Sequence, residues 1–72
     1  DALGLNRVTR QLVERRLNAL GLKPGRVDGE FNERTRRAIR RFQDRRNLDV
    51  TGYLNESTMV RLLAGGIISL FE

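Results

Sequence analysis

The chain has 72 residues, of which 39% are apolar and 32% are charged, and its formal net charge at neutral pH is +5. This length and composition predict one small folded domain with a thin core rather than a disordered segment. Because Cys and His are absent, disulfides, thiolate zinc sites and imidazole acid–base chemistry are excluded, and we expect no metal and no cofactor. The positive charge favours an anionic partner, such as nucleic acid, an acidic membrane surface or an acidic polymer.

A first helix is predicted over residues 7–20, where apolar side chains recur at helical spacing. Asn6 is the expected N-cap, and Gly21 is expected to end the helix in the left-handed conformation. Two apolar strips run along this helix, one formed by Val13, Leu17 and Leu20 and the other by Val8, Leu12 and Ala19.

The connector at residues 22–29 contains Pro-Gly and Asp-Gly, two strong turn dipeptides, and predicts a structured loop or a short hairpin. A second helix is predicted from the N-cap Asn32 to about Arg46. Its buried face consists of Thr35, Ala38, Ile39 and Phe42, and its other side is almost entirely arginine: Arg34, Arg36, Arg37, Arg40, Arg41 and Arg45. A charged row opposite an apolar face is, first of all, what an amphipathic helix shows to water.

A third helix is predicted over residues 56–64, with Asn55 as its N-cap and with inward-facing side chains at Met59, Leu62 and Leu63. Two glycines at 65–66 are expected to end it, which separates a domain of residues 1–66 from an apolar tail at 67–72. We expect this tail to fold back over Val8 and Leu12, or otherwise to begin a linker or contact a partner chain.

Two segments of the chain, residues 27–35 and 50–58, repeat one another at a distance of 23 residues. Each begins with Val, continues through a polar turn that contains Gly, and places an apolar residue before an Asn N-cap. A Thr follows three residues after the cap in both copies, where its hydroxyl can reach back to the Asn. Two such loop-to-helix units behind a leading helix predict an all-α fold, a compact three-helix domain.

Four motifs follow one another along the chain: L-x-x-L-G at 17–21, D-G-x-F-x-x-x-T at 28–35, A-I-x-x-F-Q at 38–43 and V-T-G-x-L at 50–54. Together they resemble the PGBD-like (PG-binding type 1) family of peptidoglycan-binding domains, and the resemblance runs from about Val13 to Ala64. The chain departs from the usual pattern of that family in two places. Asn32-Glu33 replaces Gly-Pro, and Glu14 stands where Gln is usual.

The resemblance implies a non-catalytic module that binds the glycan and stem peptide of bacterial peptidoglycan and anchors a neighbouring domain to the cell wall. Members of the family are joined to amidases, lytic transglycosylases, carboxypeptidases and phage lysins. The chain starts at Asp1 rather than Met, and we expect it to be a piece of a longer exported or phage protein, located in the periplasm, in the cell envelope or outside the cell. We expect a monomer, and no membrane span, since the apolar runs fall short of the ~20 residues that cross a bilayer.

Asp28 is the acidic residue that stands out, because it lies in Asp-Gly-Glu just before a helix. Turn chemistry gives it a simple role, in which it accepts a backbone N–H within its own turn and Gly29 adopts a positive φ. A metal site at Asp28 and Glu30 would have only two hard ligands, without the spaced series of a calcium loop. Catalysis by Asp28 with Glu33 or Asp44 would need an enclosed cleft, which a thin domain does not offer, so we expect no enzyme.

Nucleic acid is the alternative partner, because the arginines between residues 34 and 46 could neutralise backbone phosphates. Two features argue against it. The connector from Gly21 to Asn32 is too long for a helix-turn-helix, and side chains that could read bases are scarce. A protein–protein interaction module, with the apolar segment 67–71 as its contact, is a third interpretation.

The predicted ligand surface lies between the loop 22–29, the start of the second helix and the turn at Gly52 and Tyr53. Tyr53 is expected to stack on a sugar or a peptide, and Arg26 and Arg40 to pair with carboxylates. Three arginines of the second helix, Arg37, Arg40 and Arg41, offer a surface of planar forks for stem-peptide carboxylates or for phosphate. The candidate ligand-binding residues are Arg26, Asp28, Gly29, Arg37, Arg40 and Tyr53.

Overall fold

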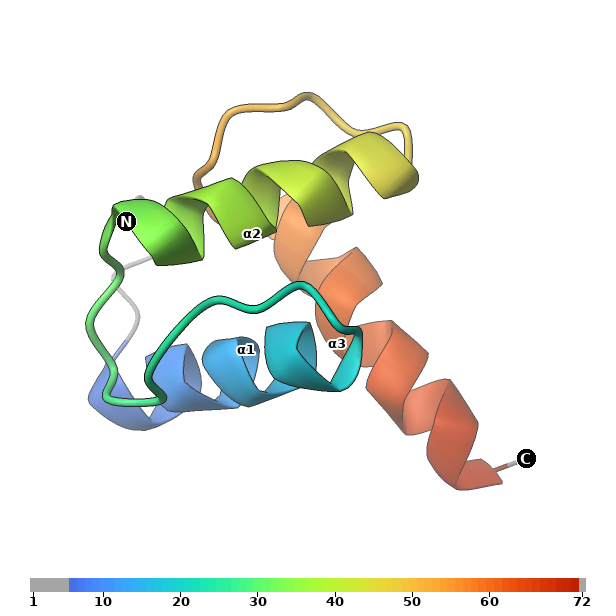
Figure 1. Cartoon of the computed structure of the whole chain (residues 1–72). Coiled ribbons are helices and arrows are strands. Elements are labelled where there is room, and N and C mark those ends of the chain that lie inside the picture. Colours follow the sequence, from blue (N-terminus) through green and yellow to red (C-terminus); the bar gives the residue numbers. More distant parts are fainter. Residues whose placement is uncertain (1–5, 72) are drawn as a thin grey trace.

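A computed structural model describes the backbone of residues 6–71 and the side chains of residues 6–64. Its helices are α1 (Arg7–Ala19), α2 (Glu33–Arg45) and α3 (Glu56–Phe71), and the described residues contain no strand. The all-α three-helix fold predicted from the sequence is therefore confirmed (Figure 1). The bounds of α1 and α2 also agree with the predicted ones to within one residue.

Each helix begins at an asparagine whose side-chain oxygen accepts the N–H of the residue three positions later. This hydrogen bond satisfies a backbone donor that has no partner within the first turn. The N···O distances are 2.8 Å from Thr9 to Asn6, 3.0 Å from Thr35 to Asn32 and 2.9 Å from Thr58 to Asn55. All three predicted N-caps are confirmed.

The first two helices end in the same way, with a residue at positive φ followed by a leucine. That residue is Gly21 (φ 76°) after α1 and Asn47 (φ 57°) after α2. The N–H of each leucine reaches back to a helical carbonyl, at 3.0 Å from Leu22 to Leu17 and at 2.9 Å from Leu48 to Gln43. This is the Schellman pattern, and the predicted end of the first helix at Gly21 is confirmed.

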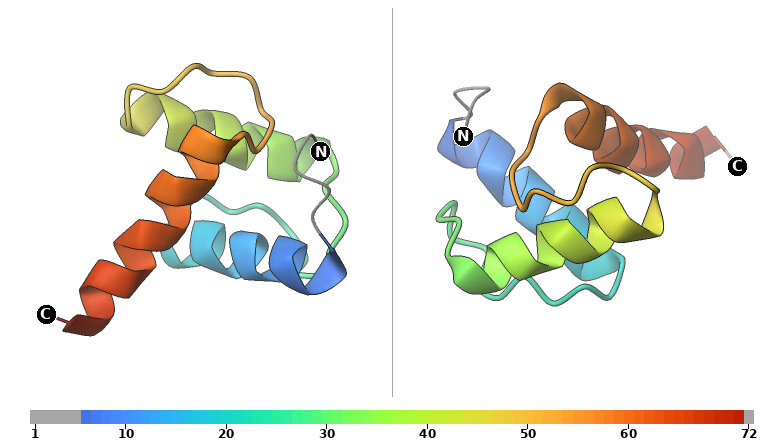
Figure 2. Two further views of the ribbon diagram at one scale, coloured as in Figure 1. Left: turned by 180° about the vertical axis from the view of Figure 1, so that it is seen from behind. Right: turned by 90° about the horizontal axis from the view of Figure 1, so that it is seen from above.

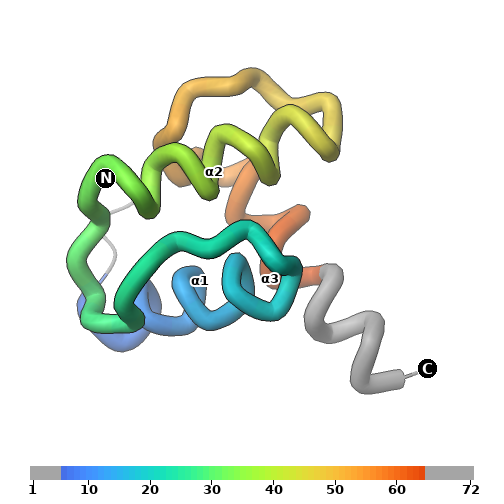
Figure 3. The backbone as a smooth tube through the Cα atoms, in the orientation of Figure 1, coloured from blue at the N-terminus to red at the C-terminus, as the bar shows by residue number. Residues whose placement is uncertain are grey.

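The two connectors have a common course, because each runs back along the helix that precedes it (Figures 1 and 3). Residues 20–32 return along α1 toward its N-terminal end, and residues 46–55 return along α2 before α3 begins. α3 then passes the C-terminal end of α1, as the view from behind in Figure 2 shows, and Arg16 Nε donates to Leu62 O at 3.1 Å there. The two loop-to-helix units found in the sequence are thus two copies of one arrangement.

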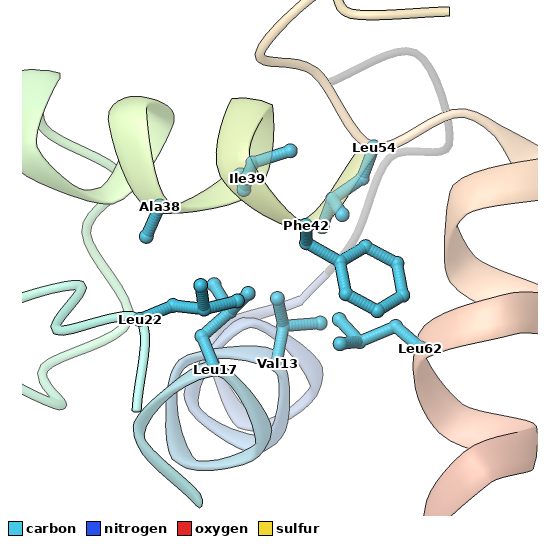
Figure 4. Close-up of a cluster of buried hydrophobic side chains, with 8 residues drawn as sticks. All are labelled: Val13, Leu17, Leu22, Ala38, Ile39, Phe42, Leu54 and Leu62. Carbon is cyan, nitrogen blue, oxygen red and sulfur yellow. The ribbon is translucent and has the colours of Figure 1, made fainter. Parts of the chain in front are cut away.

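The core lies where the three helices and both connectors meet (Figure 4). Its buried side chains are at most 2% exposed and comprise Val13, Leu17, Leu22, Ala38, Ile39, Phe42, Leu54 and Leu62. Leu20, Phe31, Leu48 and Met59 pack against them and are partly buried. The predicted buried faces of the three helices are confirmed except at Leu63, which is only partly buried and lines a surface hollow with Val60. The second apolar strip of α1 lies at the surface, with Val8 71% exposed and Leu12 47% exposed.

The predicted end of the third helix was wrong, because α3 continues through Gly65 and Gly66 to Phe71. A glycine inside a helix costs about 1 kcal/mol relative to alanine but does not by itself end the helix. The expected packing of side chains 67–71 over α1 lies outside the described residues, and so does the packing of residues 1–5.

Candidate functional site

The turn at Asp28 and Gly29 is held by side chains of α1. Both oxygens of Glu14 accept backbone N–H groups from it, at 2.7 Å from Gly29 N and at 3.3 Å from Asp28 N. Two arginines donate to its carbonyl oxygens, Arg7 Nε to Asp28 O at 3.1 Å and Arg10 Nε to Gly29 O at 2.6 Å. The polar backbone atoms of this turn are therefore engaged within the fold.

Asp28 has the role that turn chemistry predicts, since its Oδ1 accepts the N–H of Glu30 at 2.9 Å. Gly29 has a φ of 83°, as predicted. A Cβ on Gly29 would lie 2.5 Å from Cγ of Arg7 and 3.3 Å from the backbone oxygen of Arg7. The turn thus sits directly on the first turn of α1, and both its φ and this close approach require glycine.

Glu14 is a carboxyl group with no solvent exposure. Burial raises the pKa of Glu14 above 4.5, because it penalises the charged form, and the hydrogen bonds from Gly29 and Asp28 oppose that rise. A repulsive contribution from Asp28 also raises the pKa, and Arg10 lowers it. The first turn is therefore fastened to a buried group that can take up a proton.

The second turn, at Thr51 and Gly52, is held by Gln43 of α2. Gln43 Oε1 accepts the N–H groups of Thr51 and Gly52, both at 2.9 Å. Its amide nitrogen faces three oxygens, at 3.0 Å from Tyr53 O, at 3.1 Å from Thr58 Oγ1 and at 3.2 Å from Thr51 Oγ1. The Gln43 amide thus connects α2, the turn and the first turn of α3.

An exposed aromatic ring follows this turn. Tyr53 is 55% exposed, and the guanidinium carbon of Arg36 lies 4.1 Å from its ring centroid. The same guanidinium lies 5.7 Å from the ring of Phe31 and donates from Nη1 to Gly52 O at 3.0 Å. Arg36 therefore connects the start of α2 to the second turn through two aromatic contacts and one hydrogen bond.

Arg40 lies beside the same turn, because a Cβ on Gly52 would be 2.8 Å from Arg40 Nη1. Its Nη2 donates to Glu33 Oε1 at 2.6 Å, and this hydrogen bond lowers the pKa of Glu33 below 4.5. We call this surface the Tyr53 face and define it by Phe31, Glu33, Arg36, Arg40 and Tyr53.

The opposite flank of α2 carries a second cationic surface. Lys23, Arg34, Arg37 and Arg41 line a surface hollow of about 240 Å³, which we call the cationic hollow. Gly25 of the first connector packs there, since its Cβ position lies 3.3 Å from Cδ of Arg34. The arginine row of the sequence is therefore divided between two surfaces.

The six predicted ligand-binding residues are distributed over four places. Arg40 and Tyr53 come together on the Tyr53 face, and Arg37 lies in the cationic hollow. Arg26 is exposed on the first connector. Asp28 and Gly29 form the turn on α1, where their backbone groups are hydrogen-bonded, so their part in ligand binding stays a prediction.

Three residues that organise these turns are missing from the sequence-based site: Glu14, Gln43 and Arg36. The sequence does contain a signal for them. The turns repeat at 23 residues, but the helix residues that lie against them repeat at 29. This spacing pairs Glu14 with Gln43, and it pairs Arg7 with Arg36, whose backbone oxygens lie 3.3 Å and 3.6 Å from the Cβ positions of Gly29 and Gly52. Shifting the whole sequence by 23 residues aligns the two turns but not these pairs of helix residues, so a search for one repeat distance does not find them.

Between residues 6 and 64 no three acidic side chains gather in a way that could hold a metal ion. In the same described part of the chain, no helix combines the length and the apolar character that crossing a bilayer requires.

Residues 6–62 match the family described as "Putative peptidoglycan binding domain". Searches of curated proteins and of solved structures give no match. Because the match covers most of the chain, the protein belongs to this family, as its sequence motifs predict.

Proposed function

We propose that this member of the peptidoglycan-binding domain family binds peptidoglycan, catalyses no reaction itself, and anchors a neighbouring domain to the bacterial cell wall as a monomer. The observation that supports this proposal most is the family match over residues 6–62. We also propose that the domain is part of a longer exported or phage protein. Its location would then be the periplasm, the cell envelope or the outside of the cell.

The Tyr53 face is the surface that we propose for ligand binding. The Tyr53 ring is more than half exposed, and Arg36 covers it from one side while bonding to the turn that carries it. An aromatic ring held in this way loses little conformational freedom when a sugar or a peptide stacks on it. Arg40 lies beside it and supplies a guanidinium for a carboxylate, in exchange for its exposed partner Glu33.

The other predicted site residues take different parts in this proposal. Arg26 and Arg37 are exposed and serve as further carboxylate partners outside the Tyr53 face. Asp28 and Gly29 shape the first connector through their bonds to α1 and keep the start of α2 in place.

A sedimentation assay with purified peptidoglycan sacculi tests the proposal. The wild-type domain should pellet with sacculi and release no soluble fragments from them. Tyr53→Ala should weaken binding about tenfold, the factor that corresponds to about 1.4 kcal/mol of lost stacking. Its stability should change by less than ~1 kcal/mol, as for a surface substitution away from caps and core. Val50→Ala is the matched control, because Val50 lies in the same connector and is 52% exposed.

The outcomes separate peptidoglycan from the alternative partner. A wild-type domain that stays in the supernatant at moderate salt, and binds duplex DNA instead, would replace this proposal by nucleic-acid binding. Equal binding by Tyr53→Ala and Val50→Ala would keep the function but move the site away from the Tyr53 face.

A further inference from the structure

The cationic hollow brings together four positive side chains from two segments of the chain. Arg34, Arg37 and Arg41 follow one another at three and four residues, which places them on one flank of α2. Lys23 comes from the first connector and completes the lining. Three of the four cations are guanidinium groups, whose planar forks suit oxyanions.

The fold holds Lys23 at this position. Its two neighbours Leu22 and Pro24 are buried, so the backbone between them is fixed and the lysine is directed outward. Thr35 Oγ1 donates to Pro24 O at 3.1 Å and ties the connector to α2. Lys23 itself has a φ of 55°, a conformation that side chains other than glycine, asparagine and aspartate rarely adopt. Strained backbone of this kind is concentrated at functional sites.

No carboxylate among residues 6–64 forms an ion pair with any of the four side chains. Glu33 interacts with Arg37, but its hydrogen bond goes to Arg40 on the other flank. Like charges three and four residues apart on a helix repel one another and destabilise it. The hollow therefore gathers positive charges that have no ion-paired carboxylate among the described residues, and a bound anion would relieve their mutual repulsion.

We infer that the cationic hollow binds carboxylate groups of the peptide part of peptidoglycan, separately from the Tyr53 face. This inference rests on the proposed function for its ligand. The four cations can bind more than one oxygen at a time, and the hollow is large enough to admit a carboxylate with part of its peptide. The sequence predicted Arg37, Arg40 and Arg41 as the carboxylate-binding arginines of α2. In the structure Arg37 and Arg41 line the hollow with Lys23 and Arg34, whereas Arg40 belongs to the Tyr53 face.

The main experiment compares native sacculi with sacculi whose carboxyl groups have been amidated. Wild type should bind the amidated sacculi about fivefold more weakly than native sacculi. The double variant Arg37→Gln/Arg41→Gln should bind native sacculi about fivefold more weakly than wild type and should lose most of the response to amidation, while the rest of that response comes from Arg40 and Arg26. Arg15→Gln/Arg61→Gln removes the same charge from exposed positions on α1 and α3, and it should behave as wild type.

A second measurement does not depend on sacculi. Citrate, at the ionic strength of a sodium chloride control, should raise the Tm of wild type and of Arg15→Gln/Arg61→Gln but not that of Arg37→Gln/Arg41→Gln. Matched ionic strength is needed because salt screens surface charges in all three proteins. Helical circular dichroism shows whether each variant is folded.

Sacculus binding by wild type that does not respond to amidation would overturn the inference and leave the proposed function intact. Equal losses in the two double variants would also overturn it, because the effect would then come from net charge alone. If wild type binds no sacculi, the proposed function fails, and so does the assignment of the hollow to peptidoglycan carboxylates. A rise in Tm with citrate that is absent from Arg37→Gln/Arg41→Gln would then still identify the hollow as an anion site, and no such rise would exclude it. Binding that is lost when wall-linked phosphate polymers are removed, with no effect of amidation, would assign the hollow to phosphate instead.

Discussion

The two returning connectors perform the same task with different chemistry. In the first, the carboxylate of Glu14 accepts the N–H groups of Asp28 and Gly29. In the second, the amide of Gln43 accepts those of Thr51 and Gly52 and also donates to the turn and to α3. An amide can satisfy donors and acceptors at once, whereas an ionised carboxylate can only accept.

This difference has two physical consequences. The Gln43 interaction integrates three elements, while the Glu14 interaction serves the turn alone. Burying a neutral amide with all its partners also costs less than burying a carboxylate, whose pKa rises as a result. The first turn is therefore the one whose stability depends on pH.

The largest effect should come from removing the two acceptors. Gln43→Leu should destabilise the domain by about 3 kcal/mol, because two N–H groups and the partners of the amide nitrogen lose their hydrogen bonds. Glu14→Leu should cost less, about 2 kcal/mol, since it also removes the burial of a charge. Urea denaturation at pH 7 measures both. A larger loss for Glu14→Leu would show that the first turn is the more important one.

The two turn glycines should rank in the opposite order, with the glycine of the first turn the more sensitive to substitution. Both have a φ near 80°, so alanine at either position should lower the free energy of unfolding by about 1 kcal/mol through the left-handed conformation alone. Gly29→Ala should cost about 2 kcal/mol in total, because its Cβ would meet Cγ and the backbone oxygen of Arg7. At Gly52 the Cβ would lie 2.8 Å from Nη1 and 3.3 Å from Cγ of Arg40, a flexible side chain that can shift, and the nearest backbone atom, Arg36 O, is 3.6 Å away. Thermal unfolding that ranks Gly52→Ala as the worse variant would contradict this close approach on α1.

The smallest effect, and the most specific, concerns protonation. Because the pKa of Glu14 is raised above 4.5 on folding, its contribution to stability is fully present below pH 4.5 and is lost as pH rises through the folded-state pKa. Glu14→Gln should remove this decline and leave the domain more stable than wild type at pH 7, by up to about 1 kcal/mol.

The difference in unfolding free energy between wild type and Glu14→Gln, measured from pH 3 to pH 8, isolates this group. Glu33 titrates in both proteins with the opposite sign, since its lowered pKa gives stability that is lost as pH falls. A difference that does not vary with pH would show that Glu14 has the same pKa in the folded and unfolded chains.

The features that could be predicted from sequence are those set by local chemistry. Helix periodicity identified Leu17, Ile39 and Phe42 as core, and asparagine capping located the start of every helix. The end of α3 was missed because a Gly-Gly pair allows a helix to end without requiring it.

The candidate site was less predictable, because its contacts join residues that local patterns do not connect. Tyr53 could be proposed as a ligand residue because it lies next to a predicted turn, and the structure leaves it 55% exposed. Arg36 could not be separated from the other arginines of α2 until the second connector was seen to lie against it. The division of these arginines between the Tyr53 face and the cationic hollow depends on where both connectors pass, which is a tertiary property.

The different spans of the two connectors also bear on the order in which the domain folds. Gln43 reaches residues only eight and nine positions ahead, whereas Glu14 reaches fourteen and fifteen. Closing the shorter loop costs about 0.5 kcal/mol less conformational entropy. We therefore expect the second unit to form first, with substitutions around Gln43 slowing refolding and substitutions around Glu14 mainly accelerating unfolding. In a chain built from two copies of one unit, the kinetic roles of the copies would then be set by the length of each loop.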